Sequence, residues 1–356
     1  MKKLIAVFLI LFSLNGLCQD YHYWSEHYGT RASLLGGAAT AGLGDIATVY
    51  YNPAAMAFTD KPSLSVTVNA YKIRSVKLHN AVGDGLDMKQ TQFSTFPNFI
   101  GGMAKFKKLP RIRLGYAMLA KRAWVSNFDH LFEGEFDLVV ATPGLEHYTA
   151  NYNLFHSINE YLGGFAISYK LSDTWSIGFA HFGNYRSVKY SNNIDVNVFP
   201  ADSTPGALRT ISSEVNFNYY NIKGIIKPSI AIDAKNFKFG MVYTSPSFSI
   251  LGKGNVYRKS EFINYEFKPG QFATASLVDS RKGVNVKHKE AASLALGVSW
   301  RFKKKAWLHF TNEIFFAVPY YLLFDPSNEV NVYPTNYFVE DTIYAFGGDQ
   351  NFLAYG

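Results

Sequence analysis

The chain of 356 residues holds one cysteine, Cys18, so it cannot form an internal disulfide bond. Charged residues are scarce as well, at 17% of the chain against about 25% in an average soluble protein. After Leu14 no apolar run reaches the ~18–20 residues that a membrane-spanning helix needs. These absences exclude a small disulfide-stabilised domain and a helical membrane protein.

The first residues have the three parts of an export signal. Two lysines precede an apolar run over residues 4–14, and small residues stand at positions −3 and −1 of a cleavage site after Cys18. Residues 1–18 are therefore predicted to be a signal peptide. A lipoprotein interpretation of Cys18 is the weaker alternative, because the preceding Leu17 is not small.

The formal net charge is +8, and loss of the leader lowers it to +6. On an exported protein this mild excess suits loops that face anionic lipid head groups. The chain has no dense Lys/Arg tract with interleaved aromatics, so no binding to nucleic acid is expected.

From Lys61 onward, large apolar residues alternate with small or polar ones, which is typical of strands with two different faces. About eleven strands of roughly 8–14 residues are expected. The clearest alternation covers residues 64–70, 111–118, 164–169, 175–180, 237–244, 293–302 and 308–316.

A cation that faces lipid costs about 2–4 kcal/mol at the bilayer midplane, so Arg111 and Arg113 should face away from lipid. The large apolar set is then expected to meet lipid. The other set, rich in Gly, Ala, Ser and Thr, would face a lumen with few charges. Because only helices and closed barrels satisfy their backbone groups in hydrocarbon, the expected fold is all-β, an antiparallel transmembrane β-barrel over residues 61–356. A soluble β-sandwich is the alternative.

This prediction places the chain in the bacterial outer membrane, among membrane lipid and lipopolysaccharide. Residues 122–160, 191–213 and 318–345 are polar or irregular and are expected to be long extracellular loops. Short periplasmic turns are expected at residues 107–110, 171–173 and 303–305. Single-chain barrels have even strand numbers, so we expect either further strands within 254–290 and 330–352 or, as the favoured alternative, closing strands beyond Gly356.

Residues 19–60 differ from the rest, because they are rich in glycine and show no strand alternation. Short helical turns joined by glycines would suit them. A barrel of about 14 strands is too wide to be filled by its own side chains. This segment is therefore predicted to be an N-terminal plug inside the lumen.

Residues 29–41 and 45–57 resemble the N-terminal stretch of the FadL/TodX-type outer-membrane transporters of hydrophobic compounds. The pattern is a Gly-Gly-Ala run, an aspartate and an Asn-Pro-Ala, and here it falls on Gly36, Gly37, Asp45, Asn52, Pro53 and Ala54. Residues 240–246 and 291–302 also look like the family. The resemblance implies a barrel of about 14 strands whose hatch is residues 19–60. It also implies passage of hydrophobic small molecules such as long-chain fatty acids, although some relatives are accessory barrels of secretion machinery.

The hatch motif has a physical logic of its own. Pro53 fixes its own backbone angle and biases Asn52 away from helix. The Asn52 side chain can then bond to nearby backbone groups. Gly36 and Gly37 allow left-handed backbone and close packing.

No catalytic, cofactor or metal site is expected. Residues 42–47 fit G-x-G-x-x-A but lack the βαβ unit that a dinucleotide site requires. His309, Thr311 and Glu313 share one strand face, and a hydrogen-bond network is favoured there over a Ser/His hydrolase. The chain is thus interpreted as a passive transporter and not as an enzyme, with its ligand-binding residues unassigned. The alternative is a non-transporting accessory or scaffold subunit of a larger outer-membrane complex for secretion or assembly, because the long loops are rich in Tyr and Phe.

Overall fold

The computed structural model describes residues 26–59, 64–81, 87–137, 144–199, 208–268, 271–303, 306–325 and 353–354. The predicted signal peptide, residues 1–18, lies outside the described residues. Within them, no helix has both the length and the apolar character needed to cross a membrane.

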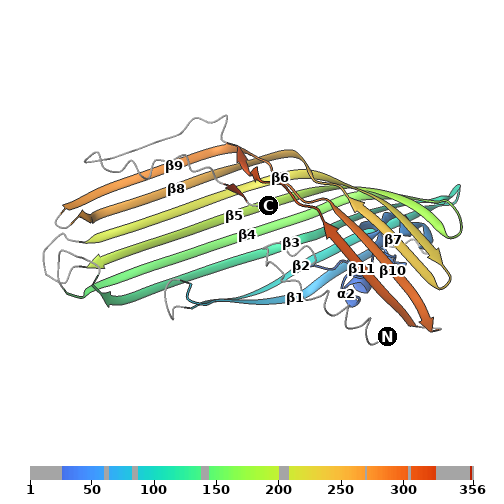
Figure 1. The fold of residues 1–356 in the computed structure, drawn as a ribbon, viewed down its shortest axis with the longest axis horizontal. Coiled ribbons are helices and arrows are strands. Elements are labelled where there is room, and N and C mark those ends of the chain that lie inside the picture. The colour runs from blue at the N-terminus through green and yellow to red at the C-terminus, as the bar shows by residue number, and fades with distance from the viewer. Residues whose placement is uncertain are drawn as a thin grey trace, which may run out of the picture.

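One antiparallel sheet of 12 strands makes up most of the described residues (Figure 1). Its strands are β1 (Leu64–Leu78), β2 (Met88–Phe106), β3 (Leu109–Phe136), β4 (Glu146–Lys170), β5 (Trp175–Phe199), β6 (Arg209–Ala234), β7 (Phe237–Thr244), β8 (Phe248–Lys268), β9 (Gln271–Val286), β10 (Ser293–Lys303), β11 (Ala306–Phe315) and β13 (Phe324–Asp325). A separate pair joins β12 (Tyr321–Leu322) to β14 (Leu353–Ala354). The predicted antiparallel all-β class is confirmed.

Strands β1 to β6 pair in chain order, and the sheet then divides along β6. β7 pairs with one end of β6 and β8 with the other, so β7 and β8 form one long lane with a break at residues 245–247. β10 and β9 form the next lane, with a break at residues 287–292, and β11 and β13 form the last. β11 and β13 are likewise separated by a break. The three breaks lie side by side in neighbouring lanes. We call residues 287–292 the strap.

Three short helical elements precede the sheet, as the glycine-rich composition predicts. They are α2 (Thr30–Leu34), α3 (Thr48–Tyr51) and the 3₁₀ helix η1 (Pro53–Phe58). Residues 26–59, which we call the N-segment, lie at the end of the sheet that includes β7, β10 and β11 (Figure 1). Its Ile46, Val49 and Met56 share a buried core with Phe99 of β2 and Phe182 of β5. We call the face of the sheet that touches the N-segment the segment face.

Glycines in the strands allow the N-segment to approach closely. A Cβ added to Gly178 of β5 would lie 2.2 Å from the backbone nitrogen of Ala54, and one added to Gly240 of β7 would lie 1.9 Å from the carbonyl oxygen of Thr40. Both distances are far below van der Waals contact, so only glycine fits. The small-residue set of each strand therefore meets the N-segment.

The opposite face carries the large apolar side chains at this end of the sheet. Phe165 is 76% exposed and Trp300 is 57% exposed. Other exposed members are Leu114, Tyr116, Met118, Ile167, Tyr169, Trp175, Ile177, Phe179, Phe302, Leu308, Phe310 and Ile314. At this end of the sheet the predicted division of the strands into a bulky and a small-residue side is confirmed.

The predicted loops at 122–160 and 191–213 are wrong in large part. β3 continues to Phe136 and β4 begins at Glu146, while β5 continues to Phe199 and β6 begins at Arg209. Polar side chains on one face hid these strands, whereas Phe128, Phe132 and Val188 are buried on the other face. Backbone ladder bonds join the strands along their whole length. Strands consequently reach 28 residues, twice the expected length. Of the third predicted loop, 318–345, the structure describes only residues up to 325, including β12 and β13.

The predicted short turns lie where the sequence indicated. Residues 107–108 connect β2 to β3, and residues 171–174 connect β4 to β5. Both are at the end of the sheet near the N-segment. For the third turn, residues 304–305 lie outside the described residues. Among the described strands, β1 and β11 stand at opposite ends of the pairing order, and no pairing joins them.

Candidate functional site

The predicted hatch motif fastens the N-segment to the sheet. Asn52 is extended, as the following proline predicts, and its Oδ1 accepts a hydrogen bond of 3.1 Å from the backbone nitrogen of Ala54. Its Nδ2 donates to the carbonyl oxygens of Thr40 at 2.8 Å and Ile230 at 3.3 Å. Pro53 begins η1. Asn52 is fully buried, so it joins two parts of the N-segment to β6 away from water.

Ala54 extends this junction through its backbone. Its nitrogen donates to Ser229 Oγ of β6 at 2.9 Å, and its carbonyl oxygen accepts from Ser176 Oγ of β5 at 2.8 Å. The serines are on the segment face and are buried. Small hydroxyl residues on that face therefore serve as partners for the N-segment backbone.

The remaining motif residues shape the N-segment itself. Asp45 Oδ1 accepts from the backbone nitrogen of Ala47 at 3.1 Å and so starts the turn into α3. Burial raises the pKa of Asp45, against the lowering effects of the Ala47 N–H and of Arg31. Gly36 and Gly37 both have positive φ, at 58° and 86°. The structure brings Asn52, Pro53 and Ala54 together at the sheet, while Gly36 is exposed and distant from this junction.

Three tyrosines of the N-segment, Tyr28, Tyr50 and Tyr51, pack against one another. The Tyr51 hydroxyl accepts a hydrogen bond of 3.0 Å from the backbone nitrogen of Tyr28. Burial raises the pKa of Tyr51 to about 12, so the hydroxyl stays protonated. Tyr50 packs edge-on against Tyr28 at 5.1 Å, and Lys227 of β6 lies 4.0 Å from the centre of the Tyr50 ring.

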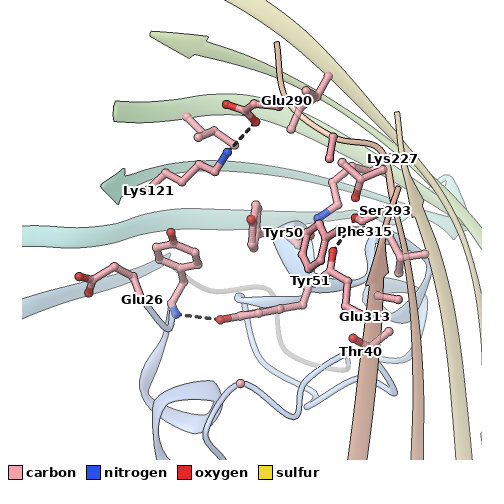
Figure 2. A pocket seen from close by; sticks show the side chains of 18 of the residues that line it. Glu26, Thr40, Tyr50, Tyr51, Lys121, Lys227, Glu290, Ser293, Glu313 and Phe315 are labelled. Atoms are coloured by element: carbon pink, nitrogen blue, oxygen red, sulfur yellow. Dashed lines mark hydrogen bonds and ion pairs between the residues drawn. The ribbon is translucent and has the colours of Figure 1, made fainter. Parts of the chain in front are cut away.

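A cavity of about 90 Å³ separates these tyrosines from the sheet (Figure 2). Charged side chains line it, including Lys121, Lys227, Glu290 and Glu313. The volume is a few times the roughly 30 Å³ that one water occupies, and it is well below the ~300–1,000 Å³ of a small-molecule pocket. By this measure the cavity has room for a few water molecules.

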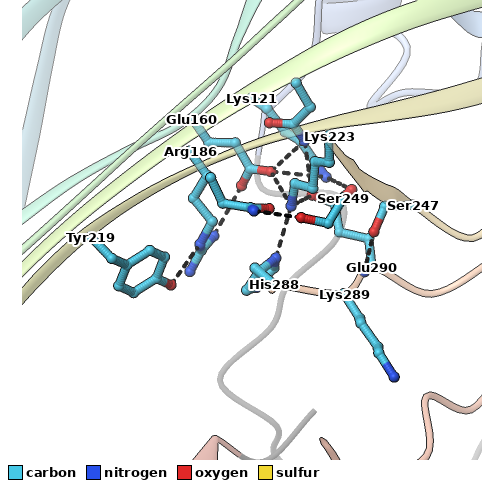
Figure 3. Close-up of polar contacts among 12 residues, drawn as sticks. Lys121, Glu160, Arg186, Tyr219, Lys223, Ser247, Ser249, His288, Lys289 and Glu290 are labelled. Carbon is cyan, nitrogen blue, oxygen red and sulfur yellow. Dashed lines mark hydrogen bonds and ion pairs between the residues drawn. The ribbon is translucent and has the colours of Figure 1, made fainter. Parts of the chain in front are cut away.

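Next to the cavity lies a layer of buried charge, shown in Figure 3. Glu160 Oε2 is 3.1 Å from Arg186 Nη1, and Glu160 Oε1 is 3.4 Å from Lys223 Nζ. Glu290 Oε2 is 2.6 Å from Lys121 Nζ, and Glu290 also pairs with Lys223. Side-chain exposure is 0% for Lys223, 3% for Glu160 and 4% for Arg186. We call these five residues the charged layer.

Neutral groups complete the layer. Asn184 Nδ2 donates to Glu160 Oε1 at 2.6 Å and to Glu290 Oε1 at 2.8 Å. His288 Nδ1, on the strap, accepts from Lys223 at 2.8 Å. The expectation that the small-residue side carries few charges is therefore wrong at this level. Three cations and two carboxylates from four strands and the strap pair with one another there.

Two irregularities supply key members of the charged layer. Lys121 is the extra residue of a bulge in β3, between the pairs Ala120–Tyr161 and Arg122–Glu160. Bulges redirect side chains in this way. Glu290 comes from the strap, whose backbone bonds to Ser247 at the adjacent break: Glu290 N donates to Ser247 Oγ at 2.8 Å.

Beyond the charged layer, on the side away from the N-segment, the polar and apolar faces of the strands exchange places. In β5 the opposite face carries Trp175, Ile177, Phe179, His181, Gly183 and Tyr185 first, and then Ser187, Lys189, Ser191, Asn193, Asp195 and Asn197. The register of β5 with β4 and β6 is unbroken, so all these residues share one face. On the segment face the order is reversed: Ser176, Asn184 and Arg186 give way to Val188, Tyr190, Ile194 and Val196.

β6 shows the same exchange. Its opposite face runs from Ile232, Ile230 and Ile222 to Asn218, Asn216 and Glu214, and its segment face runs from Ser229 and Lys223 to Tyr219, Phe217 and Val215. We call the part of β3–β6 beside the N-segment the basal half. The part beyond the charged layer, together with β8 and β9 that pair beside it, is the projecting half. In the projecting half, Tyr190 and Phe217 stack at 4.8 Å on the segment face.

The residues considered for catalysis or metal binding do not form such a site. Within the described ranges, no group of three His, Cys, Asp or Glu side chains is arranged to hold a metal. His309 Nδ1 bonds to the fully buried Ser299 Oγ at 2.7 Å, and Glu313 accepts from Ser293 at 2.5 Å. These are two separate hydrogen bonds between β10 and β11, so they do not themselves make up the predicted network.

Sequence reasoning missed the charged layer and the polarity exchange. The charged layer left one signal, since Glu160 is the only Asp, Glu, Lys or Arg between Glu146 and Lys170. Comparison of the chain with protein-family models, with curated proteins and with solved structures found no match in any of the three.

Proposed function

We propose that this chain is an outer-membrane β-barrel whose N-segment is the plug, and that it lets hydrophobic small molecules such as long-chain fatty acids pass by diffusion. In this proposal it is not an enzyme and uses no cofactor. Its partners are lipid, lipopolysaccharide and the apolar ligand. The resemblance of residues 29–57 to the FadL/TodX-type transporters supports the family, and the polarity exchange along β5 and β6 carries the membrane assignment.

The height of the apolar band supports a membrane location. From Trp175 to Tyr185 the opposite face of β5 carries four large apolar or aromatic side chains, one glycine and His181, whose ring stacks on Phe248. Ten residues of strand rise about 33 Å, and a strand tilt of roughly 40° reduces this to about 25 Å. That is the height of the lipid-facing band in outer-membrane barrels. The polar face that follows suits water, so the projecting half would stand outside the membrane.

The segment face supports an apolar ligand. In the projecting half it offers aromatic and branched side chains, including Tyr190, Phe217, Ile194 and Val196, that are only half-buried. Exposed apolar area of this kind favours burial against an apolar molecule. The ligand would be captured there and would pass the charged layer towards the cavity beside the plug.

Uptake by cells tests this proposal. A deletion strain should accumulate radiolabelled dodecanoate and naphthalene more slowly than the same strain carrying the gene on a plasmid. Uptake of glycerol, which is small and polar, should be equal in both. Unchanged uptake of every apolar compound tried would contradict transport.

A second function is favoured by the opposite face of the projecting half. This face presents rows of amides and hydroxyls across several strands, with cross-strand bonds such as Asn255 Nδ2 to Asn218 Oδ1 at 3.0 Å and Ser212 Oγ to Asp195 Oδ1 at 2.6 Å. A rigid polar surface outside the membrane would suit a scaffold subunit of a larger complex. Purification in mild detergent followed by mass spectrometry separates the two: stoichiometric protein partners support the scaffold, and an isolated barrel with bound lipid supports the transporter.

A further inference from the structure

Glu290 is the one member of the charged layer that does not lie on a strand. The strap carries it between β9 and β10, and the other four members lie on β3, β4, β5 and β6. Irregular segments open at lower free energy than paired strands. Glu290 can therefore leave the layer without breaking the ladders that hold its partners. The strap has to give up its own bonds to Ser247, Tyr321 and Leu323.

The position of Glu290 is a built anion site. Lys121 Nζ lies 2.6 Å from one carboxylate oxygen, and Asn184 Nδ2 lies 2.8 Å from the other, which also pairs with Lys223. Three donors from three different strands thus converge on one carboxylate. Lys223 and Asn184 are buried to 99% or more, so these donors are held in place.

We propose that Glu290 acts as an internal ligand of this anion site, and that the carboxylate head group of an incoming amphiphile replaces it when the strap withdraws. The inference rests on the proposed transport function and adds the regulation of its path. The ligand class is a molecule with one negative charge and an apolar chain. The chain would lie towards Tyr219 and Phe217 on the segment face.

The balance of charge gives the reason for an anion. With Glu290 in place, Lys121, Arg186 and Lys223 face two carboxylates. Without it, three buried cations would face Glu160 alone. Uncompensated buried charge is strongly destabilising, so the strap can withdraw only if another anion enters. A neutral apolar molecule cannot make this exchange.

The location explains why such an exchange would matter. The charged layer lies between the apolar surface of the projecting half and the cavity that Lys121 and Glu290 help to line. At about 90 Å³ the cavity is small for an amphiphile. A strap released by a matching anion would join the two spaces only when such a ligand is present.

The first test compares binding of octanoate and octanol to the wild type and to Glu290→Gln, by equilibrium dialysis in nonionic detergent against protein-free micelles. The variant removes the internal competitor, so octanoate should bind about tenfold tighter or more, whereas octanol binding should not change. Glu261→Gln is the matched control, since Glu261 also pairs with a lysine and accepts from a serine but lies on β8 of the projecting half. Equal octanoate affinity in wild type and Glu290→Gln would overturn the proposal.

A second measurement covers the case in which binding is weak or the variant is unstable. Glu290→Ala should have a lower thermal midpoint than wild type, and butyrate should raise it while butyramide does not. Adding Lys223→Met should abolish that response. Absence of any butyrate effect on Glu290→Ala would overturn the anion site even if cells take up dodecanoate, whereas rescue without cellular uptake would contradict only the transport function.

Discussion

The basal and projecting halves of β5 share one unbroken alternation but have opposite polarity. In the basal half, Phe179 is exposed and Ala180 is fully buried against the N-segment side. In the projecting half, Lys189 and Asn193 take the place of the bulky set, and Val188 and Tyr190 lie on the segment face. Alternation therefore reports that two faces differ, but the surroundings of each half decide which face is apolar.

The halves also differ in what fills the segment face. In the basal half the N-segment covers it, with backbone-to-glycine contacts and the bonds of Asn52. In the projecting half, Tyr321, Leu323 and Phe324 cover only part of it, next to Val256 and Val286. A covered face supports precise packing, while a half-covered face leaves room for a ligand.

The difference between the two halves predicts that a charge added to the opposite face of the basal half has the largest effect on stability. Phe179→Lys should lower the free energy of unfolding in lipid bilayers by about 2–4 kcal/mol, because the ammonium would sit in the apolar band. Asn193→Lys, on the same face of the same strand, should change it by less than about 0.5 kcal/mol. Urea titrations of both variants in vesicles provide the measurement, and equal effects would break the distinction between the halves.

The next effect concerns the contact between the basal half and the N-segment. Gly178→Ala places a Cβ 2.2 Å from the backbone of Ala54 and should destabilise the protein by about 1–3 kcal/mol. Gly163→Ala on the neighbouring β4 is the control, because its Cβ meets nothing within 4 Å. Thermal unfolding in detergent should show a lower midpoint only for the first variant. A normal midpoint for Gly178→Ala would contradict the docking of η1 on β5.

A third prediction compares a buried and an exposed asparagine. Asn52→Ala removes the bonds to Thr40, Ile230 and Ala54 and should cost about 1–3 kcal/mol, since buried partners lose their bonds. Asn218→Ala removes one exposed bond in the projecting half and should cost less than about 0.5 kcal/mol. Limited proteolysis of the N-segment provides a direct readout, because only Asn52→Ala should expose it. Equal resistance of both variants would argue against the hatch motif as a fastener.

The smallest expected effect is on the segment face of the projecting half. Tyr190→Ala removes the stacked pair with Phe217 and should cost about 0.5–1.5 kcal/mol. Octanol binding should weaken as well if this face captures ligands. Phe155→Ala, on the opposite face of β4, serves as control and should leave octanol binding unchanged. Equal binding by both variants would remove the proposed role of this surface.

Several features could be predicted from local sequence. Pro53 after Asn52 predicted the extended backbone and the side-chain bonds of the asparagine, because both depend on neighbouring residues. The lysines at 107–108 and the Leu-Ser-Asp at 171–173 predicted turns for the same reason. The long hairpins were missed, because the many polar residues on one face of these strands resemble a loop.

The amino-acid sequence alone determined the two-faced strands, the separate glycine-rich N-segment and its Asn-Pro fastener, since each follows from side chains within a few positions. Only the tertiary structure decided that β7 and β8 form one lane, that Lys121 sits in a bulge, and that Glu160, Arg186, Lys223 and Glu290 meet. These depend on strand register and on the course of the strap, which together bring residues up to 169 positions apart into ion pairs only after the sheet has formed.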